Sequence, residues 1–292
     1  MAARPIAPDA ASHGWSLLDV RTPEAFRAGH LSGSGHLPAA ELEPRRAELP
    51  PRDQPVVALA DDPEDARAAA LALETMGYHD VAWLDRSLAA IPGGHAEVGP
   101  ATRLWRPAPF LEAVLPLLPR GRAVDLAAGS GREAVFLALH GFEVEARDRA
   151  PEALARAADL AARHGARLRT LVCDLERLDP PLASAAWDVI TVFRFLHRPL
   201  FRAIEAALAP GGMLVYETYR VGQERFGRPC SRRYLLESGE LAAAFPALEV
   251  IRSEEPGPPA GPITARLLAR KPRPALAAPR RSDSPGSFPG PI

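Results

Sequence analysis

Two successive series of short apolar strands and helical patterns make up most of this chain, and their order limits what it can fold into. The first series covers residues 16–93 and the second covers residues 110–269. The segment IPGGHAEVGPAT, residues 91–102, breaks both series with glycine and proline and is the best linker candidate. Strands that alternate with helices form parallel sheets covered by helices. The sequence therefore predicts two α/β domains, which a length of 292 residues allows.

The expected domain boundaries follow from these patterns. Residues 1–93 are expected to form a small domain with a parallel sheet, and residues 94–104 a linker. Residues 105–271 are expected to form a Rossmann-like, doubly wound sheet of seven strands. The tail, residues 272–292, is rich in Pro, Ser, Ala and Arg and is expected to be disordered.

Several helices are predicted from helical spacing of apolar residues and from capping signals. Thr22 precedes the segment PEAFRAG in the position of an N-cap. Residues 41–49, 110–118 and 234–245 are also expected to be helical.

Composition and charge exclude several classes of protein. No apolar run is long enough to cross a bilayer, and the segment MAARPIAPDA lacks the apolar core of a signal peptide. Only Cys173 and Cys230 occur, so we expect no disulfide framework and no metal site, and a reducing cytoplasm is the expected location. A net charge of −1 gives no general attraction to nucleic acid. We therefore expect neither a membrane nor nucleic acid among the partners.

The charge differs between the two halves of the chain. Residues 1–95 carry 8 basic and 14 acidic residues, a net charge of −6, whereas residues 96–271 carry 24 and 21, a net charge of +3. Opposite net charges attract weakly, and a linker of about a dozen residues keeps two domains close. We therefore expect the two domains to dock on each other.

The segment LLDVRTPEAFRAGHLSGSGHLP, residues 17–38, resembles the opening of rhodanese-homology domains, and residues 77–90 resemble their last strand and helix. Active rhodaneses carry a nucleophilic cysteine on the loop after the central strand. Ala60 stands in that place here, beside several carboxylates, and a methyl group cannot replace a thiolate. The resemblance thus implies a rhodanese fold without sulfur transfer. It leaves open whether this domain serves folding and interfaces or holds a small ligand. Asp19, Arg21 and His30 are expected to make structural hydrogen bonds.

The segment AVDLAAGSGREAVFLA, residues 123–138, places two glycines between a predicted strand and a predicted helix. Glycine permits positive φ and a close approach of a ligand to the backbone, and the following helix N-terminus attracts an anion. The spacing Asp125-x-Ala127-x-Gly129-x-Gly131 lacks the G-x-G-x-x-G form of dinucleotide-binding folds. It resembles the first motif of class I S-adenosylmethionine methyltransferases.

Three further motifs carry the same resemblance. Asp148 ends the second strand of this domain, where the family uses an acid to accept hydrogen bonds from ribose hydroxyls. Asp174 and Leu175 follow the third strand, where an acid and the next backbone N–H contact the adenine ring in the family. LAPGGMLVYET, residues 208–218, resembles the turn into the fifth strand. The implied cofactor is S-adenosylmethionine. The residues assigned to it are Asp125, Ala127, Gly129, Gly131, Arg132, Asp148, Asp174, Leu175 and Phe193.

The methyl acceptor is less defined. VFRFLHRPLF, residues 192–201, lacks the Asn/Asp-Pro-Pro-aromatic motif of enzymes that methylate amino groups of nucleic acids. Residues 131–148 resemble the tellurite-resistance and thiopurine methyltransferase branch, which modifies small soft nucleophiles. Methyl transfer from a sulfonium depends mostly on orientation, and a harder acceptor would need a general base, for which His197 is the candidate. The candidate acceptor-binding residues are Arg194, Tyr219, Gln223 and Arg225.

The sequence therefore predicts a cytoplasmic methyltransferase for a small molecule, joined to an inactive rhodanese-like domain. Two alternatives stay open. The protein could bind S-adenosylmethionine as a sensor without turnover, or it could methylate RNA or protein.

Overall fold

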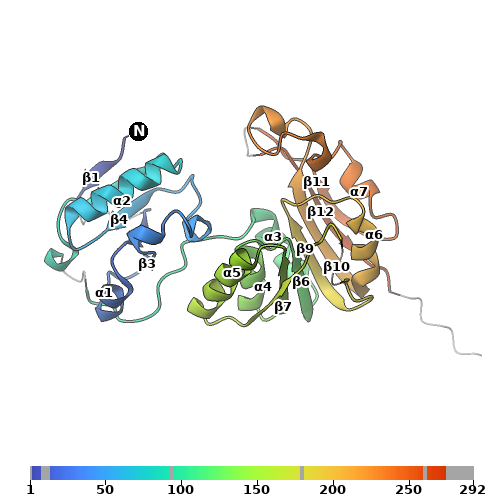
Figure 1. Cartoon of the computed structure of the whole chain (residues 1–292), viewed down its shortest axis with the longest axis horizontal. Coiled ribbons are helices and arrows are strands. Elements are labelled where there is room, and N and C mark those ends of the chain that lie inside the picture. Colours follow the sequence, from blue (N-terminus) through green and yellow to red (C-terminus); the bar gives the residue numbers. More distant parts are fainter. Residues whose placement is uncertain (1, 8–13, 92–94, 178–180, 259–261, 274–292) are drawn as a thin grey trace, which may run out of the picture.

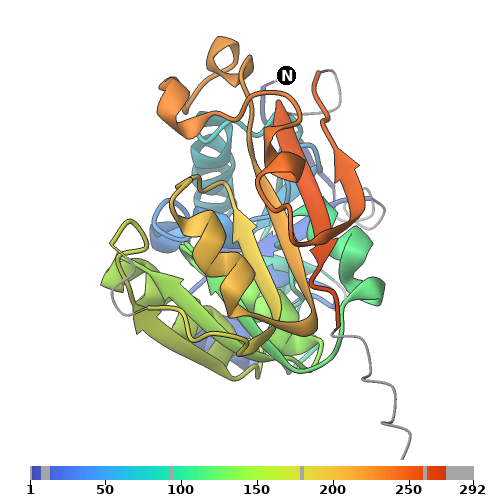
Figure 2. The same cartoon turned by 90° about the vertical axis from the view of Figure 1, so that its right-hand side faces the viewer.

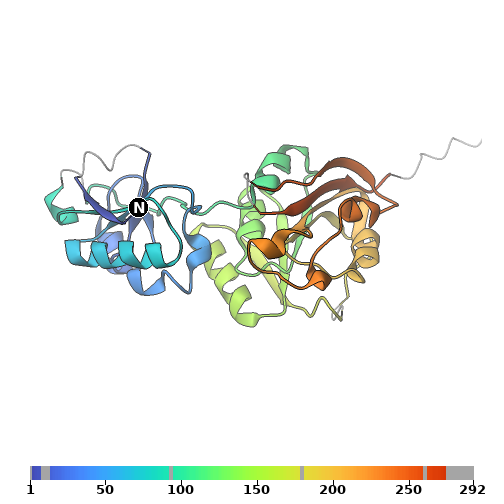
Figure 3. The same cartoon turned by 90° about the horizontal axis from the view of Figure 1, so that it is seen from above.

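The computed structural model describes residues 2–7, 14–91, 95–177, 181–258 and 262–273. Figures 1 and 3 show two lobes, each built around its own sheet and connected by a single extended segment. The predicted disordered tail lies outside the described residues except for residues 272–273. No helix within the described ranges is long and apolar enough to cross a membrane.

The first lobe contains a parallel sheet of five strands in the order β1-β5-β4-β2-β3. The strands are β1 (Arg4–Ile6), β2 (Ser16–Asp19), β3 (Gly35–His36), β4 (Val56–Leu59) and β5 (Val81–Leu84). The helices are α1 (Pro23–Ala28) and α2 (Pro63–Thr75), with short 3-10 turns η2 (Ala39–Glu41), η3 (Arg46–Glu48) and η4 (Leu88–Ala90). The central strand β4 is fully buried, as expected for a parallel sheet covered on both faces. The predicted small parallel-sheet unit is confirmed, and β1 was not predicted.

The second lobe contains seven strands in the order β11-β12-β10-β9-β6-β7-β8, with β12 antiparallel to both neighbours. The strands are β6 (Arg122–Leu126), β7 (Glu143–Asp148), β8 (Leu168–Val172), β9 (Trp187–Phe193), β10 (Leu208–Tyr219), β11 (Glu249–Glu254) and β12 (Thr264–Arg270). The predicted seven-stranded, doubly wound sheet is therefore confirmed.

Helices cover both faces of this sheet, as Figures 1 and 2 show. On one face lie α3 (Pro109–Val114), which continues as η5 (Leu115–Leu117), α4 (Arg132–Leu139) and α5 (Pro151–Arg163). On the other lie α6 (Leu200–Ala207) and α7 (Glu240–Ala243). Two separate apolar cores fill the spaces between the sheet and the two helix layers.

Three predicted helices are shorter or absent. Residues 41–49 form only η2 and η3 with turns between them, because Pro44 lacks the N–H that a continuous helix needs. Residues 110–118 leave the α-helical form after Val114, two residues before Pro116. In residues 234–245 only α7 is helical, after the 3-10 turns η6 (Gln223–Arg225) and η7 (Arg232–Tyr234). There Leu236 donates its N–H to the Tyr219 carbonyl, which keeps the chain extended.

The predicted cap of α1 is present, since the Thr22 hydroxyl accepts the Ala25 N–H at 3.3 Å.

Candidate active site

The glycine loop joins the end of β6 to the start of α4. Ala127, Gly129 and Gly131 all adopt positive φ, at 59°, 54° and 80°. A Cβ at Gly131 would lie 2.4 Å from the Cβ of Ala157 on α5, so this glycine is required for the close packing of two helices. A Cβ at Gly129 would meet no atom within 4 Å. The loop therefore leaves its Gly129 side open, where a ligand can approach the backbone.

Asp148, at the end of β7, ties the neighbouring strand to this loop. Its Oδ2 accepts the Gly129 N–H at 2.9 Å, and its Oδ1 accepts the Ala150 N–H at 2.9 Å. The second contact closes a local turn just before α5. Each carboxylate oxygen can accept more than one hydrogen bond, so the half-buried carboxylate keeps capacity for hydroxyl donors.

Asp125 lies inside the sheet, below the loop. Its Oδ1 accepts the Thr191 hydroxyl at 2.7 Å, and its Oδ2 makes no hydrogen bond of good geometry within the described residues. Burial raises the pKa of Asp125 well above its ordinary value, and the neighbouring Glu133 carboxylate raises it further. Asp125 thus links the end of β6 to β9 through Thr191.

A cavity of about 890 Å³ opens at the carboxyl ends of β6, β7, β8, β9 and β10. Ligands of doubly wound sheets bind at this edge, and the volume is in the range of small-molecule sites. Its walls combine acids, apolar side chains and hydroxyls. The lining residues are Ala127, Asp148, Arg149, Cys173, Asp174, Leu175, Glu176, Arg194, Phe195, Leu196, Thr218, Tyr219, Arg228, Pro229, Cys230, Ser231 and Tyr234.

The floor of the cavity after β8 has the features predicted for an adenine site. Asp174 is half-buried, its Oδ1 accepts the Glu176 N–H at 3.0 Å, and its Oδ2 lies 3.5 Å from Arg177. Leu175 and Cys173 are buried beside it and give apolar contact area for a planar ring. The residues present therefore fit a nucleoside that carries hydroxyl and amino donors.

The structure brings some of the predicted cofactor residues together and separates others. Four of them line the cavity, namely Ala127, Asp148, Asp174 and Leu175. The remaining five, Asp125, Gly129, Gly131, Arg132 and Phe193, are not among the lining residues. Gly129 and Gly131 belong to the glycine loop, and Asp125 belongs to β6 just before it. Phe193 packs against the core beside α4, and Arg132 faces a second cavity.

The predicted acceptor residues divide in the same way. Arg194 and Tyr219 line the cavity. His197, Gln223 and Arg225 do not. Gln223 is buried, and its Oε1 accepts the Ile263 N–H at 2.8 Å, which gives it a structural role. His197 is half-buried after β9, so its assignment as a general base stays a prediction.

One wall of the cavity was not assigned to it from the sequence. Residues 228–231 and Tyr234 form this wall. Arg198 fixes this segment, since it donates to the carbonyls of Arg233 and Leu235 and pairs with Glu240. The signal in the sequence is the polar stretch after the fifth strand, residues 216–229, which can cover the acceptor side and includes the first two residues of this wall.

In the first lobe, the loop that carries the cysteine of active rhodaneses is short and closed. Only three residues separate β4 from α2. Ala60 is buried and its carbonyl accepts the Leu88 N–H, while Asp62 caps α2 by accepting the Glu64 N–H. Pro63 lacks an N–H. The loop thus presents few donors to an anion.

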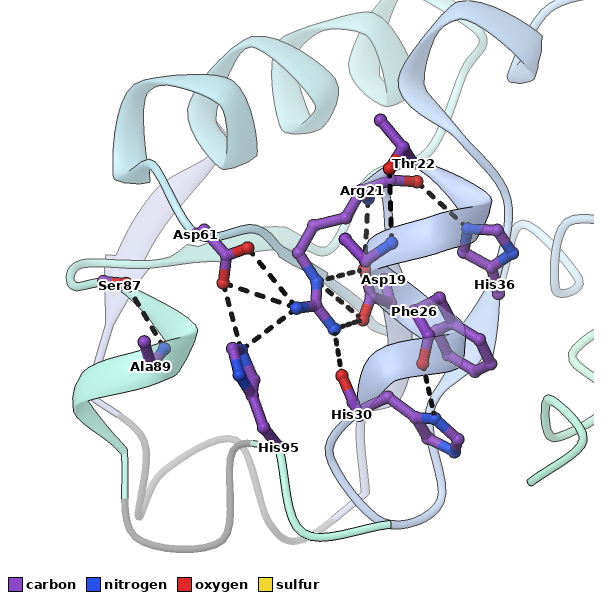
Figure 4. Close-up of polar contacts among 12 residues, drawn as sticks. Asp19, Arg21, Thr22, Phe26, His30, His36, Asp61, Ser87, Ala89 and His95 are labelled. Atoms are coloured by element: carbon purple, nitrogen blue, oxygen red, sulfur yellow. Dashed lines mark hydrogen bonds and ion pairs between the residues drawn. The ribbon is translucent and has the colours of Figure 1, made fainter. Parts of the chain in front are cut away.

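Figure 4 shows how neighbouring polar groups occupy the space beside this loop. Arg21 is buried and forms a two-pronged pair with Asp19, and it also donates to the Gly29 carbonyl at 2.8 Å. His95 reaches in from the connecting segment, with Nε2 3.0 Å from Arg21 and 3.1 Å from Asp61. His30 contacts the Phe26 carbonyl and stacks on its ring. Asp19, Arg21 and His30 are thus hydrogen-bonded inside the fold, in agreement with their expected structural role.

Comparison with known families assigns a type to each lobe. Residues 7–91 match the rhodanese-like domain, and residues 123–212 match a methyltransferase domain. Both predicted domain types are thereby confirmed. The methyltransferase match contains the glycine loop, Asp148 and Asp174, and it supports S-adenosylmethionine as the cofactor.

Individual relatives are more distant. Hemagglutinin 1 from Eikenella corrodens is 29% identical over 153 residues, which are 49% of this chain and 49% of that protein. The chain therefore spans about half the length of this relative. TehB from Haemophilus influenzae is 17% identical over 56% of this chain and 61% of its own, with a TM-score of 0.47. An S-adenosylmethionine-dependent methyltransferase from Mesorhizobium loti is 22% identical over 56% of this chain and 99% of its own, with a TM-score of 0.45.

Proposed function

We propose that residues 105–271 bind S-adenosylmethionine and catalyse methyl transfer to a small-molecule acceptor. The observation that carries this proposal is the cavity at the carboxyl ends of the parallel strands, where Asp148 and the open side of the glycine loop meet. In this assignment Asp148 accepts from the ribose hydroxyls. Asp174 and the Leu175 backbone hold the adenine ring.

The remaining side chains of the cavity suit an acceptor. When bound, S-adenosylmethionine supplies an electrophilic methyl group on a sulfonium. The chain holds the two reactants in line and excludes water, which is the main contribution that such a displacement needs. Tyr219 and Thr218 provide hydroxyls at the cavity wall, and Arg194 provides a positive charge. The absence of a lining histidine or lysine among the described residues favours soft acceptors that need no strong base.

The Asp148→Ala variant tests the cofactor assignment. Loss of a carboxylate that accepts two hydroxyls should cost about 1.5–3 kcal/mol, or about ten- to a hundredfold in affinity. Calorimetry should show this loss for both S-adenosylmethionine and its demethylated product. Glu143→Ala, at the other end of the same strand, is the control and should bind normally. Absence of binding by the wild type, or a preference for NAD, would overturn the assignment.

A non-enzymatic sensor is the competing function, because the same residues would bind the cofactor. Turnover separates the two. An acceptor screen with labelled S-adenosylmethionine over thiols, chalcogen oxyanions, small carboxylates and total RNA decides between a small-molecule enzyme, an RNA methyltransferase and a sensor.

We also propose that the rhodanese-like domain transfers no sulfur. Ala60 provides no nucleophile, and Asp61 and Asp62 beside it would raise the pKa of any thiol placed there. The protein should therefore show no transfer from thiosulfate to cyanide, and Ala60→Cys should not restore it. Turnover that survives replacement of both Cys173 and Cys230 would contradict this view.

The domains are proposed to stay docked. Arg45 of the first domain lies 3.1 Å from Asp159 on α5, and Arg163 pairs with Glu48 across the same boundary. The connecting segment also adheres to the first domain, since His30 and Glu97 pair through their backbones and Thr102 donates to the Ser34 carbonyl. The cytoplasm is the proposed location, because Cys173 and Cys230 form no disulfide.

A further inference from the structure

A second cavity, also of about 890 Å³, lies between the two domains. The first domain contributes residues 46–47, 49–54, Met76 and Tyr78 to its walls. The second domain contributes residues 106–109, Glu112, Arg132, Arg194 and Pro262. We call this space the interdomain cleft.

The interdomain cleft is strongly basic. Five arginines line it, and only two acids, Asp53 and Glu112, do so; the arginines are Arg46, Arg52, Arg106, Arg132 and Arg194. Arg46 pairs with Glu43 at 3.5 Å, and Arg106 pairs with Glu112 at 3.0 Å. The side chains of Arg52, Arg132 and Arg194 make no ion pair or hydrogen bond with any residue that the structure describes. Three guanidinium groups without a hydrogen-bonded or ion-paired partner among the described residues thus line one space, and of these the Arg194 charge also acts on the nearby Glu217 carboxylate.

Tyr78 shows that charges from both domains converge there. Burial raises the pKa of the Tyr78 hydroxyl to about 12, and Arg52 and Arg132 both oppose this rise. Arg52 belongs to the first domain and Arg132 to the start of α4 in the second. An anion beside Tyr78 would therefore be near guanidinium groups from both domains.

Arg194 connects the interdomain cleft to the cofactor cavity, because it lines both. It follows β9 directly and adopts a φ of 56°, a left-handed conformation that is unfavourable for a residue with a Cβ. Its N–H donates to the Glu217 carbonyl at 2.8 Å, which holds this conformation. An exposed arginine in a strained conformation at the junction of two cavities suits a ligand that extends from one to the other.

We propose that the interdomain cleft binds the carboxylate or oxyanion group of the methyl acceptor, held by Arg52, Arg132 and Arg194. This inference rests on the proposed methyltransferase function and adds a substrate class to it. It also gives the rhodanese-like domain a direct part in substrate binding through Arg52. Arginine suits this task because its planar fork matches the geometry of carboxylates and oxyanions.

The reaction that this arrangement serves balances for a thiol acceptor. The thiolate sulfur forms a new S–C bond to the methyl group while the S–C bond of the sulfonium breaks. The thiol proton leaves to solvent, and the sulfonium becomes a neutral thioether. The anionic group of the acceptor takes no part in bond changes and serves only for binding.

Two thiols that differ in one group test the proposal through turnover. Mercaptoacetate carries a carboxylate, and 2-mercaptoethanol carries a hydroxyl in its place. We expect the wild type to prefer mercaptoacetate, and Arg52→Gln to reduce kcat/KM for it by about tenfold or more with little change for 2-mercaptoethanol. The affinity for S-adenosylmethionine should not change. Arg67→Gln, an exposed arginine on α2 outside the cleft, is the control.

Inorganic sulfate tests the cleft without turnover. Calorimetry at low ionic strength should show one bound sulfate, weakened about tenfold or more by Arg52→Gln and by Arg132→Gln but not by Arg67→Gln. If neither thiol is methylated, this binding measurement alone decides whether the cleft holds an anion. If S-adenosylmethionine binds normally and the Arg52→Gln variant binds sulfate as tightly as the wild type, the proposed anion site in the cleft is refuted and the methyltransferase assignment stays intact. Loss of S-adenosylmethionine binding in the wild type would instead refute the assignment on which the cleft depends.

Discussion

Gly131→Ala is the substitution for which the structure gives the clearest expectation. The new Cβ would lie 2.4 Å from the Cβ and 3.1 Å from the Cα of Ala157. The second of these is a backbone atom, so a side-chain rotation cannot relieve the contact. Either α4 must move away from α5 or the glycine loop must change shape. Gly129→Ala makes a matched comparison, because its Cβ would meet nothing within 4 Å at a similar positive φ.

The expected magnitudes differ for these two alanines. Positive φ costs a non-glycine residue about 1–2 kcal/mol, and this cost applies to both variants. Overpacking adds about 1–3 kcal/mol at Gly131 only. We therefore expect Gly131→Ala to lose about 2–5 kcal/mol of stability and Gly129→Ala about 1–2 kcal/mol. Compared with its loss of stability, Gly129→Ala should lose more affinity for S-adenosylmethionine than Gly131→Ala does, because the new Cβ occupies the open side of the loop.

Urea unfolding and calorimetric titration measure the two quantities separately. A third variant combines Gly131→Ala with Ala157→Gly and so removes the Ala157 Cβ that the new methyl group would contact at 2.4 Å. The double variant should be more stable than the sum of the single effects predicts, by about 1–3 kcal/mol. Equal stability losses for the two alanines, or no coupling between positions 131 and 157, would refute the packing argument.

Three further variants test other parts of the structure. The Asp125→Asn variant should become more stable relative to the wild type as the pH rises from 5 to 8, measured by urea unfolding. The Asp125 carboxyl group has a raised pKa in the folded protein, so its contribution to the stability of the wild type is lost as the pH rises toward that pKa. His164 accepts the Trp105 indole N–H at 3.0 Å, and burial lowers the pKa of its imidazole. The wild type should therefore lose stability as the pH falls below about 6.5, and the His164→Gln variant should lose less stability over the same range. Asp159→Arg should replace the attraction to Arg45 by repulsion and weaken the proposed domain docking by about 1 kcal/mol, seen as a larger radius of gyration in solution scattering, and an unchanged radius would count against docking.

Local sequence patterns predict the two sheets and the loop at Gly131 well. The strands β2, β4, β5, β6 and β9 are short, mostly apolar runs, and their length and bounding turns suffice to identify them, whereas β1 (Arg4–Ile6) carries no such signal. The spacing from Asp125 to Gly131 sets the backbone conformation itself, since positive φ at two glycines builds the turn. Asp148 was found for the same reason, because its distance from the loop along the chain is fixed by one helix and one strand.

Contacts between segments far apart in the sequence are not predictable in this way. The wall at residues 228–231 depends on Arg198, which reaches carbonyl groups more than thirty residues away. The sequence pattern at residues 234–245 favours a helix, yet the hydrogen bond from Leu236 to Tyr219 overrides that local preference. The basic lining of the interdomain cleft is likewise invisible in the sequence, since Arg52 and Arg194 are brought together only by the placement of the two domains.

The connecting segment supports the proposed docking of the two domains. Leu104 packs against the core of the first domain, and the next residue, Trp105, is buried in the core of the second. No flexible residue therefore separates the two anchoring points, although about ten linker residues precede them. The proposed docking therefore needs little more than to restrict rotation about this connection, and the ion pair between Arg45 and Asp159 would contribute to that restriction. In the docked arrangement proposed above, this connection would keep Arg52 near Arg132, and the first domain would contribute Arg52 to the proposed acceptor site.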